Sequence, residues 1–349
     1  MNATIVAVDL AKSIFEIAAA DADWRIAQRS RLPRSKFFGF FMQLEPCQVV
    51  MEACGSAHYW ARRISALGHT VRLLPAHYVK AYVRRNKTDR ADAAALLEAA
   101  RCADIRQVPV KTVDAQQIQS LHRLRSQWMS TRQRYVNTLR GILREFGFAI
   151  PLGVNVAKDR IGTALADPES EVPPALRATL AEMLQEIRLL EQKILGIEHQ
   201  LHALTRDDMR VQQLRQIPGI GALTSTALRA IVGDIQRFPS GRHFASWLGL
   251  TPNERSSAEK RRLGKISKQG DVYLRTLIVH GARSALLGAH RAERSGHPLD
   301  HLRRWALDCE RQRGHNKATV ALANRLARIV WATWTHERPF DGNWSTQAA

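Results

Sequence analysis

The chain has 349 residues, enough for two or three domains that each bury a core of their own. Lysine and arginine (52) outnumber aspartate and glutamate (32), and the resulting net charge of +20 favours a polyanionic partner such as DNA or RNA. There is no uninterrupted apolar run of 18 residues and no signal peptide, so we expect a cytoplasmic, nucleoid-associated protein with no membrane partner. The four cysteines form no CxxC pair and no zinc-binding spacing, so any metal is expected to be held by oxygen.

The first hundred residues predict a mixed sheet with helices packed on it. Residues 4–10 (TIVAVDL) form a β-branched, nearly continuous apolar run of the kind found in central strands. Active sites in such folds gather at the carboxyl ends of the strands. Further strands are expected at residues 13–20, 24–29, 48–51 and 70–74, and helices at residues 35–44, 57–67 and 86–100.

Four carboxylates stand out in this region. Asp9 lies near the end of the first strand and Glu52 follows the fourth strand, so both are expected at the active edge of the sheet. Asp89 and Asp92 lie at i and i+3 of the following helix, which puts them on one face with Cβ atoms about 5–6 Å apart. Taken alone, this pair fits an ordinary acidic helix start equally well, with Thr88 or Asp89 as the N-cap. Together, the four acids predict a site for Mg²⁺ or Mn²⁺, and two such ions can clamp the attacking and leaving oxygens of a phosphodiester.

The motifs around these acids resemble those of a known family. Asp9 in VAVDLAK, Glu52 in VVMEACGS and the pair in NKTDRADA resemble the DEDD set of resolvase-like nucleases with an RNase H-like fold. NKTDRADA in particular is similar to the motif of the DEDD transposases of insertion-sequence family 110. The resemblance implies an RNase H-like (RuvC-like) N-terminal domain in which Asp9, Glu52, Asp89 and Asp92 are the catalytic metal ligands.

A long basic helix is predicted after this domain. Residues 115–144 contain no acid and six arginines, and their apolar residues recur at roughly helical spacing. Solvated helix faces normally mix both signs of charge, so an acid-free helix favours contact with phosphates. Residues 151–174 contain glycine and proline and are expected to form a break or a flexible linker. The arginines assigned to nucleic-acid contact are Arg123, Arg125, Arg132 and Arg134.

The clearest periodicity in the chain is a coiled-coil seam. Such a seam needs a partner, either the Arg-rich helix of the same chain or a second protomer. We favour the second protomer, and therefore a homodimer or a higher homo-oligomer. The apolar residues of the seam recur with spacings of four and three, at Leu176, Leu180, Met183, Ile187, Leu190, Ile194, Ile197, Leu201 and Leu204.

The segment Pro218-Gly219-Ile220-Gly221 lies between two predicted helices. It predicts a helix-hairpin-helix element, whose glycines let backbone N–H groups approach a phosphate, with an ordinary tight turn as the alternative. Gly219 and Gly221 are therefore candidate nucleic-acid contacts.

A dense basic stretch follows the apolar residues 244–251, and composition alone predicts only a polar loop. The order GLTP, SS, LGKISKQGD and LR, however, resembles the C-terminal transposase domain of the same family. The family's nucleophilic serine matches Ser257, but Ala258 stands where the family usually has glycine, which leaves Ser256 as the alternative. The expected nucleic-acid contacts here are Arg255, Lys260, Arg261, Arg262, Lys265 and Lys268.

The expected fold class is α/β plus all-α, in three parts. These are an RNase H-like metal domain with the Arg-rich helix at residues 1–150, a linker and coiled coil at 151–208, and a helical C-terminal transposase domain with the helix-hairpin-helix element at 209–349. The resemblance implies a DNA transposase or recombinase in which Ser257 forms a covalent phosphoserine link to DNA, assisted by metal ions. It also implies a structured guide RNA that pairs with donor and target DNA.

Two alternatives from other classes stay open at this point. One is a metal-only DEDD nuclease or junction resolvase, with water as the nucleophile and a structural Ser257. The other is a non-catalytic nucleic-acid-binding protein, whose acids are helix caps and core residues.

Overall fold

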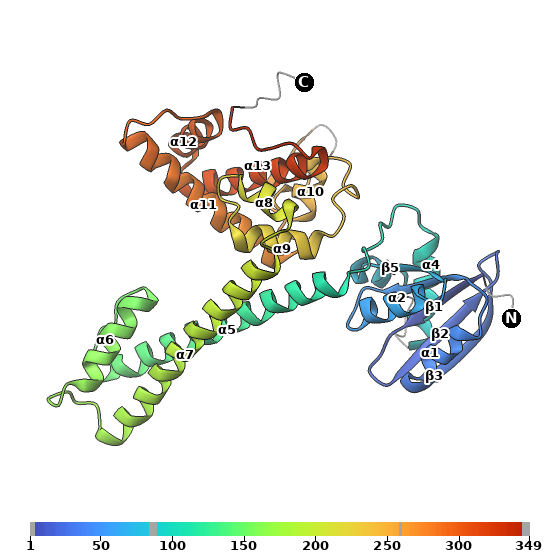
Figure 1. Ribbon diagram of the computed structural model, residues 1–349, viewed down its shortest axis with the longest axis horizontal. Coiled ribbons are helices and arrows are strands. Elements are labelled where there is room, and N and C mark those ends of the chain that lie inside the picture. Colours follow the sequence, from blue (N-terminus) through green and yellow to red (C-terminus); the bar gives the residue numbers. More distant parts are fainter. Residues whose placement is uncertain (1–3, 84–88, 258–259, 344–349) are drawn as a thin grey trace. The chain divides into compact units, whose positions relative to one another are not determined.

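The computed structural model describes residues 4–83, 89–257 and 260–343, without the side chains of Asp89 and Arg90 (Figure 1). The chain divides into two compact units, Met1–Val113 and Asp114–Ala349. The Arg-rich helix therefore belongs with the second unit, whereas we had expected it to belong with the N-terminal domain at residues 1–150.

The first unit is a five-stranded mixed sheet with helices on both faces. Its strand order is β3-β2-β1-β4-β5; β1, β4 and β5 are parallel, and β2 is antiparallel to β1 and β3. The strands are β1 (Ile5–Asp9), β2 (Ile14–Ala20), β3 (Ile26–Pro33), β4 (Gln48–Glu52) and β5 (Thr70–Leu74). The helices are α1 (Arg34–Met42), α2 (Ala57–Ser65), α3 (Ala76–Val79), the short 3-10 helix η1 (Lys80–Tyr82) and α4 (Asp89–Arg101).

This architecture confirms the mixed sheet predicted from the sequence and is consistent with an RNase H-like domain. The third strand runs further than expected, to Pro33. The predicted start of the last helix at residues 86–88, with Thr88 as an N-cap, lies outside the described residues.

Successive side chains of the strands point to opposite faces and build two separate cores. Val8 and Met51 pack under α1 and α2, whereas Ala7 and Val50 pack under α4. All four side chains are completely buried. The central strands are therefore fixed on both faces.

The second unit is almost entirely helical. Its long helices α5 (Val113–Glu145) and α7 (Pro174–Leu204) run side by side, with α6 (Val154–Ala166) packed against them (Figure 1). The C-terminal part shares one core and consists of α8 (Met209–Arg215), α9 (Ala222–Val232), α10 (Gly241–Trp247), β6 (Pro252–Glu254), β7 (Leu263–Ile266), α11 (Val272–Arg294), α12 (His301–Arg313) and α13 (His315–His336).

The coiled-coil seam of α7 packs against helices of its own chain, with its middle residues buried and its last residue, Leu204, 47% exposed. At one end Leu180 packs with Leu139 of α5, and at the other end Leu201 packs with Ile118 of the same helix. The two helices are therefore antiparallel. This pairing corrects the expectation that a second protomer covers the seam, because a 4–3 repeat shows that a helix needs a partner but not which chain supplies it.

The segment at residues 151–174 is not simply a linker, because it contains α6. Ala157, Ile161 and Ala164 form a buried apolar stripe at i, i+4 and i+7. The prolines and Gly153 flank the helix, and Gly162 lies within it without interrupting it. Within the described residues, none of the helices has the length and apolar character that crossing a membrane requires.

Candidate active site

Two of the four predicted acids lie at adjacent strand ends. Asp9 is the last residue of β1 and Glu52 the last residue of β4, and these strands are parallel neighbours with Val8 opposite Met51. By alternation, Asp9 continues the face of Ala7, and Glu52 continues the face of Val50. Both carboxylates therefore belong to the sheet face that α4 covers.

The pKa of the Cys54 thiol is affected by the negative charge at these strand ends. Burial and the nearby charges of Glu52 and Asp9 raise the pKa of Cys54 to about 11. A thiol that senses both carboxylates places the two acids in one electrostatic neighbourhood.

Asp92 comes to this region from α4. It lies one turn before Leu96, and Leu96 packs in one core with the sheet residues Ala7 and Val50. Oδ1 of Asp92 is buried and has no hydrogen-bond partner among the described residues. A buried carboxylate oxygen without a partner is costly, so this atom fits a site that a cation completes.

Asp89 is the first residue of α4, one turn before Asp92, and its side chain lies outside the described part. Among the described side chains, no group of three His, Cys, Asp or Glu residues lies within reach of one metal ion. The structure thus brings Asp9 and Glu52 to one sheet edge and places Asp92 on the facing helix. Among the described residues it does not bring the predicted ligands together around one metal position.

A further acid lies beside Asp9 that the sequence motifs did not single out. Glu16 of β2 is the register partner of Asp9, and its carboxylate forms an ion pair with Arg31 at 3.1 Å. The large apolar residues Phe15 and Ile17 on either side could have revealed its face, because successive strand residues alternate, but not its neutralising partner on β3.

The predicted nucleophile lies on a β-hairpin made by β6 and β7. Ser257 pairs with Lys260 through two backbone hydrogen bonds of 3.3 and 3.1 Å, and its side chain is exposed. Among the described residues, none forms a hydrogen bond with the Ser257 hydroxyl. Ala258, the departure from the family pattern, lies outside the described residues.

Ser256 is held differently. Its hydroxyl donates to Glu254 at 2.7 Å and accepts the backbone N–H of Arg262 at 3.1 Å. The same Glu254 oxygen lies 3.4 Å from Nε of Arg261. Both serines are exposed, but Ser256 is held by two hydrogen bonds, whereas the Ser257 hydroxyl has no partner among the described residues.

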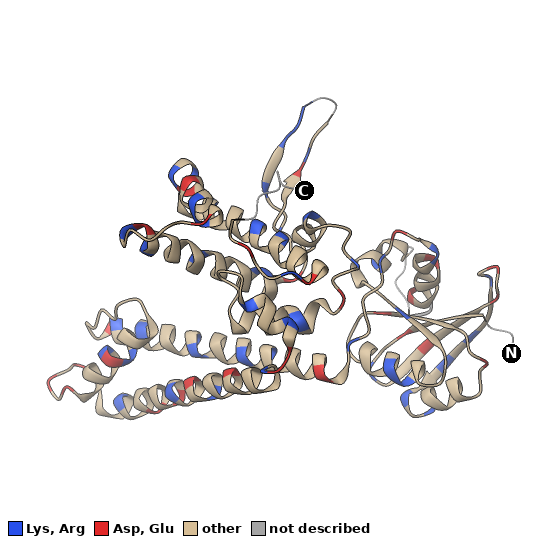
Figure 2. Cartoon of the chain, turned by 45° about the horizontal axis from the view of Figure 1, so that its top comes forward, with Lys and Arg blue, Asp and Glu red and all other residues tan. Residues whose placement is uncertain are grey.

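The hairpin is rich in lysine and arginine, whose positions along its strands are blue in Figure 2. All six predicted contact residues are exposed, and only Arg261 has an acidic partner among the described residues. The six residues are Arg255, Lys260, Arg261, Arg262, Lys265 and Lys268.

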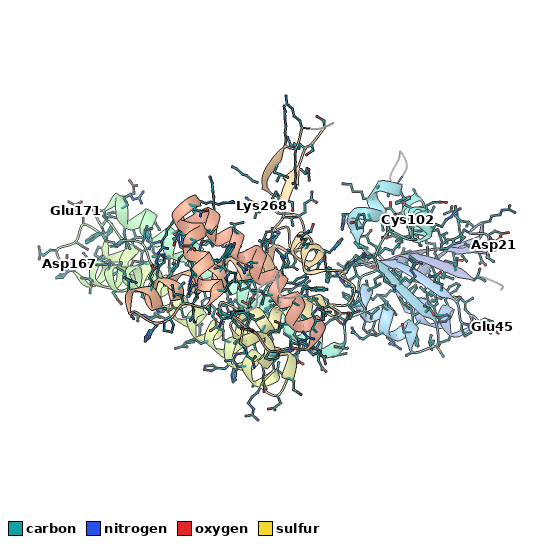
Figure 3. All side chains as sticks on the ribbon, turned by 90° about the horizontal axis from the view of Figure 1, so that it is seen from above. Asp21, Glu45, Cys102, Asp167, Glu171 and Lys268 are labelled. Atoms are coloured by element: carbon teal, nitrogen blue, oxygen red, sulfur yellow. The ribbon has the colours of Figure 1, made fainter. Side chains whose placement is uncertain are left out.

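The base of this hairpin is tightly packed. Gly249 and Gly270 have positive φ angles of 70° and 96°, and a Cβ on either one would overlap a backbone oxygen across the base. The buried Arg275 donates to the carbonyl oxygen of Leu248 at 3.0 Å. Lys268, labelled in Figure 3, lies at this base, where its backbone N–H donates to the carbonyl oxygen of Gly249 at 3.1 Å.

Comparison with known proteins decides the family. A family model described as "Transposase" matches residues 6–148, and a second, described as "Transposase IS116/IS110/IS902 family", matches residues 211–296. A probable family 20 transposase of Pseudomonas aeruginosa is 41% identical, and the alignment covers 97% of this chain and 98% of that protein. The chain belongs to the IS110 family of transposases. It is therefore a DNA transposase, as the resemblance implied.

Two other transposases align over nearly their whole length. The transposase of element IS1328 from Yersinia enterocolitica is 35% identical over 97% of this chain and 99% of that protein. The transposase of element IS1111A from Coxiella burnetii is 34% identical over 96% of this chain and 91% of that protein. The first matched region contains the four acids of the transposase, and the second contains Ser257.

The predicted contacts on α5 of the transposase fall into two groups. Arg125 pairs with Glu198 at 2.7 Å and Arg132 with Glu191 at 3.6 Å, so α7 supplies the acidic partners of these two arginines of α5. These two arginines join the helices to each other, and these ion pairs account for them without a phosphate. Arg123 and Arg134 are exposed and stay candidates.

The segment Pro218–Gly221 forms the turn between α8 and α9 of the transposase. Gly219 has φ +84°, and a Cβ there would overlap the backbone of Gly281 in α11. Close helix packing thus accounts for Gly219 without a phosphate. Gly221 has nothing within 4 Å of an added Cβ and stays a candidate contact at the start of α9.

Proposed function

We propose that the transposase cuts and rejoins DNA with Ser257 as nucleophile and with Asp9, Glu52, Asp89 and Asp92 holding a divalent cation, Mg²⁺ or Mn²⁺. One observation carries this proposal. Asp9 and Glu52 end adjacent parallel strands on the face covered by α4, whose Asp92 has a buried carboxylate oxygen without a described partner.

The donor set fits a hard cation, because all four predicted ligands offer carboxylate oxygen. When bound, a divalent cation would supply charge stabilisation for the phosphate that reacts. The residues themselves hold negative charge at the edge of a sheet that is rigid on both faces. That rigidity keeps the carboxylates in place without a large loss of side-chain freedom.

Ser257 would supply the covalent step. Its hydroxyl loses a proton to a base, a bond forms between Oγ and phosphorus, and the bond from phosphorus to the leaving deoxyribose oxygen breaks, after which that oxygen takes up a proton. A serine hydroxyl needs activation near neutral pH, and exposed cations beside it stabilise the charge that develops on the phosphate. Arg255, Lys260 and Arg262 are exposed around Ser257.

The remaining partners also belong to this proposal. A structured guide RNA would pair with donor and target DNA, and the net charge of +20 supports binding of both nucleic acids. We also propose a homodimer or a higher homo-oligomer. Its contacts would lie outside the part of the α7 seam that already packs within the chain.

The carboxylate site is tested by Asp9→Asn and Glu52→Gln, measured as DNA cleavage in Mg²⁺. Each variant should lose about 10²-fold or more in rate, because losing about 3 kcal/mol of transition-state stabilisation has that effect. Glu45→Gln is the matched control, since Glu45 is exposed and precedes the strand that Glu52 ends (Figure 3). Cleavage by Asp9→Asn and Glu52→Gln at the rate of the unaltered protein would refute the carboxylate site.

A further inference from the structure

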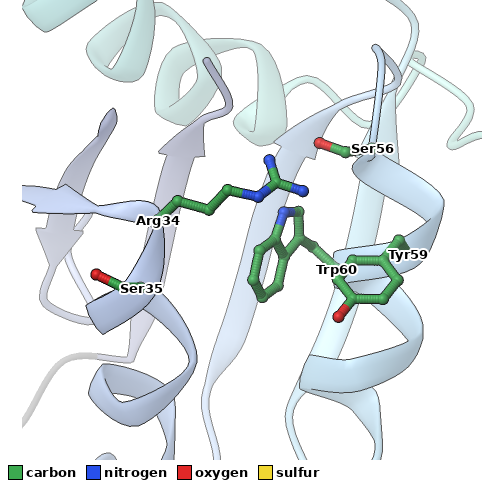
Figure 4. Close-up of a pocket in the computed structure, with 5 residues that line it drawn as sticks. All are labelled: Arg34, Ser35, Ser56, Tyr59 and Trp60. Atoms are coloured by element: carbon green, nitrogen blue, oxygen red, sulfur yellow. The ribbon is translucent and has the colours of Figure 1, made fainter. Parts of the chain in front are cut away.

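A pocket lies at the carboxyl-end edge of the sheet, on the side opposite to α4. It has a volume of about 560 Å³ and is lined by Arg34, Ser35, Ser56, Tyr59 and Trp60 (Figure 4). Arg34 and Ser35 begin α1, and the other three residues come from the first turn of α2 and its N-cap. None of them belongs to the four predicted acids.

Every polar group of this pocket suits an anion. Arg34 is exposed, has no acidic partner among the described residues, and lies over the Trp60 ring at 5.3 Å. The Ser56 side chain makes no capping hydrogen bond to the first turn of α2, so its hydroxyl does not satisfy an N–H group of that turn. Helix N-termini and arginine guanidinium groups are the usual protein partners of phosphate.

Trp60 provides an independent sign of a missing ligand. The side chain is 95% buried, and its Nε1 has no hydrogen-bond partner among the described residues. Figure 4 shows this nitrogen on the pocket side of the ring, beneath the Arg34 guanidinium and towards Ser56. A buried indole N–H normally finds an acceptor, and here the pocket is where an acceptor would come from.

The backbone of Ser56 points to the same conclusion. This residue has φ +66°, an uncommon conformation for a residue other than glycine, asparagine or aspartate. Such strained residues cluster at ligand sites, where the surrounding structure holds them in place.

The pocket and the carboxylates share one edge of the sheet. Ser56 comes four residues after Glu52, and the Arg34 N–H donates to the carbonyl oxygen of Ser13, at the β1–β2 connection that follows Asp9. A DNA strand whose phosphate occupies the pocket would pass the strand ends where Asp9 and Glu52 lie. We infer that this pocket binds a backbone phosphate of the DNA strand to be cut. The inference rests on the proposed function.

The indole N–H signal of Trp60 tests this directly. In ¹⁵N-labelled full-length protein, the eight tryptophans give separate side-chain signals, and Trp60→Phe identifies the one from Trp60. Titration with a short single-stranded DNA, without divalent cations, should move that signal until it saturates. Arg34→Gln should weaken this response about tenfold, because a charged hydrogen bond to phosphate is lost.

Arg25→Gln is the matched control. Arg25 precedes β3 and Arg34 follows it, so the same charge is removed at the opposite end of one strand. In salt titrations of DNA affinity, Arg34→Gln should reduce the steepness of the log–log slope by about one, and Arg25→Gln should leave it unchanged.

Three outcomes would overturn the assignment. They are a Trp60 signal that stays fixed while other signals show DNA binding, an Arg25→Gln effect as large as that of Arg34→Gln, and a shift with inorganic phosphate but not with DNA. These measurements need neither metal nor cleavage. A failed cleavage test of Asp9 would therefore leave the pocket standing, and a fixed Trp60 signal would leave the carboxylate site standing.

Discussion

Asp9 and Glu52 follow strand residues that are completely buried, Val8 and Met51, whereas Ser257 lies at the exposed end of a two-stranded hairpin. The carboxylates are positioned by cores on both faces of a sheet. The serine is positioned by backbone hydrogen bonds within the hairpin and by the hairpin base, where glycines and Arg275 hold the backbone. The positions of the proposed metal ligands therefore depend on core packing, whereas the position of the proposed nucleophile depends on a few backbone contacts.

The largest expected difference between the two regions is their response to truncation of an apolar side chain. Met51→Ala, next to Glu52, should lower the free energy of unfolding of the first unit by about 2–5 kcal/mol, because it opens a cavity in a closed core. Leu263→Ala in the hairpin should change stability by less than about 0.5 kcal/mol, because Leu263 is 52% exposed. Urea denaturation of both variants measures this, and equal effects would contradict the comparison.

The hairpin base can be broken at a single glycine. Gly270→Ala should cost more than about 1 kcal/mol of stability and should reduce DNA cleavage, because its positive φ and the nearby Trp247 oxygen exclude a Cβ. Gly264→Ala is the control within β7, since a Cβ there comes no closer than 3.6 Å to any atom. The account would be wrong if both variants cleaved DNA equally well.

A smaller effect concerns the junction between α5 and the helices that carry the hairpin. His122 is buried, with Nδ1 2.9 Å from Oη of Tyr273 and Nε2 3.0 Å from Oγ1 of Thr226. Burial and the positive charge of Arg125 lower the pKa of His122 from 6.5 to about 4.

This shift predicts how stability depends on pH. The unfolded chain binds the His122 proton near pH 6.5 and the folded chain only near pH 4, so stability is lost as the pH falls through this window. The free energy of unfolding should fall by up to about 1.4 kcal/mol per pH unit within this window. His122→Gln should remove this contribution to the dependence of stability on pH. Thermal unfolding between pH 7 and pH 4.5 measures it, and identical slopes in both proteins would exclude the assignment.

The sequence predicted the two strands that end in Asp9 and Glu52 because their signals are local. An apolar run that ends in Asp9 or Glu52 identifies both a buried strand and its exceptional last residue. It could not show that Arg125 and Arg132 pair with acids of α7, or that α7 packs within its own chain, because both depend on contacts between distant segments. Nor could it show the pocket at Trp60, whose residues come from two separate helices.

The hairpin was the hardest region to predict. Its strands are short and exposed, with no apolar alternation to mark them, so composition indicated only a polar loop. Family resemblance pointed to Ser257, and the structure adds that the Ser256 hydroxyl donates to Glu254, whereas the Ser257 hydroxyl has no hydrogen-bond partner among the described residues. The distinction between the two serines depends on side-chain contacts that no motif contains.

The most direct test of the proposed chemistry is to look for the covalent link itself. Protein, guide RNA and end-labelled DNA are incubated in Mg²⁺ and separated on a denaturing gel. The account predicts label retained on the protein, lost in Ser257→Ala and largely kept in Ser256→Ala. Clean cleavage without an adduct, together with full activity of Ser257→Ala, would contradict the serine mechanism and support a nuclease that uses water.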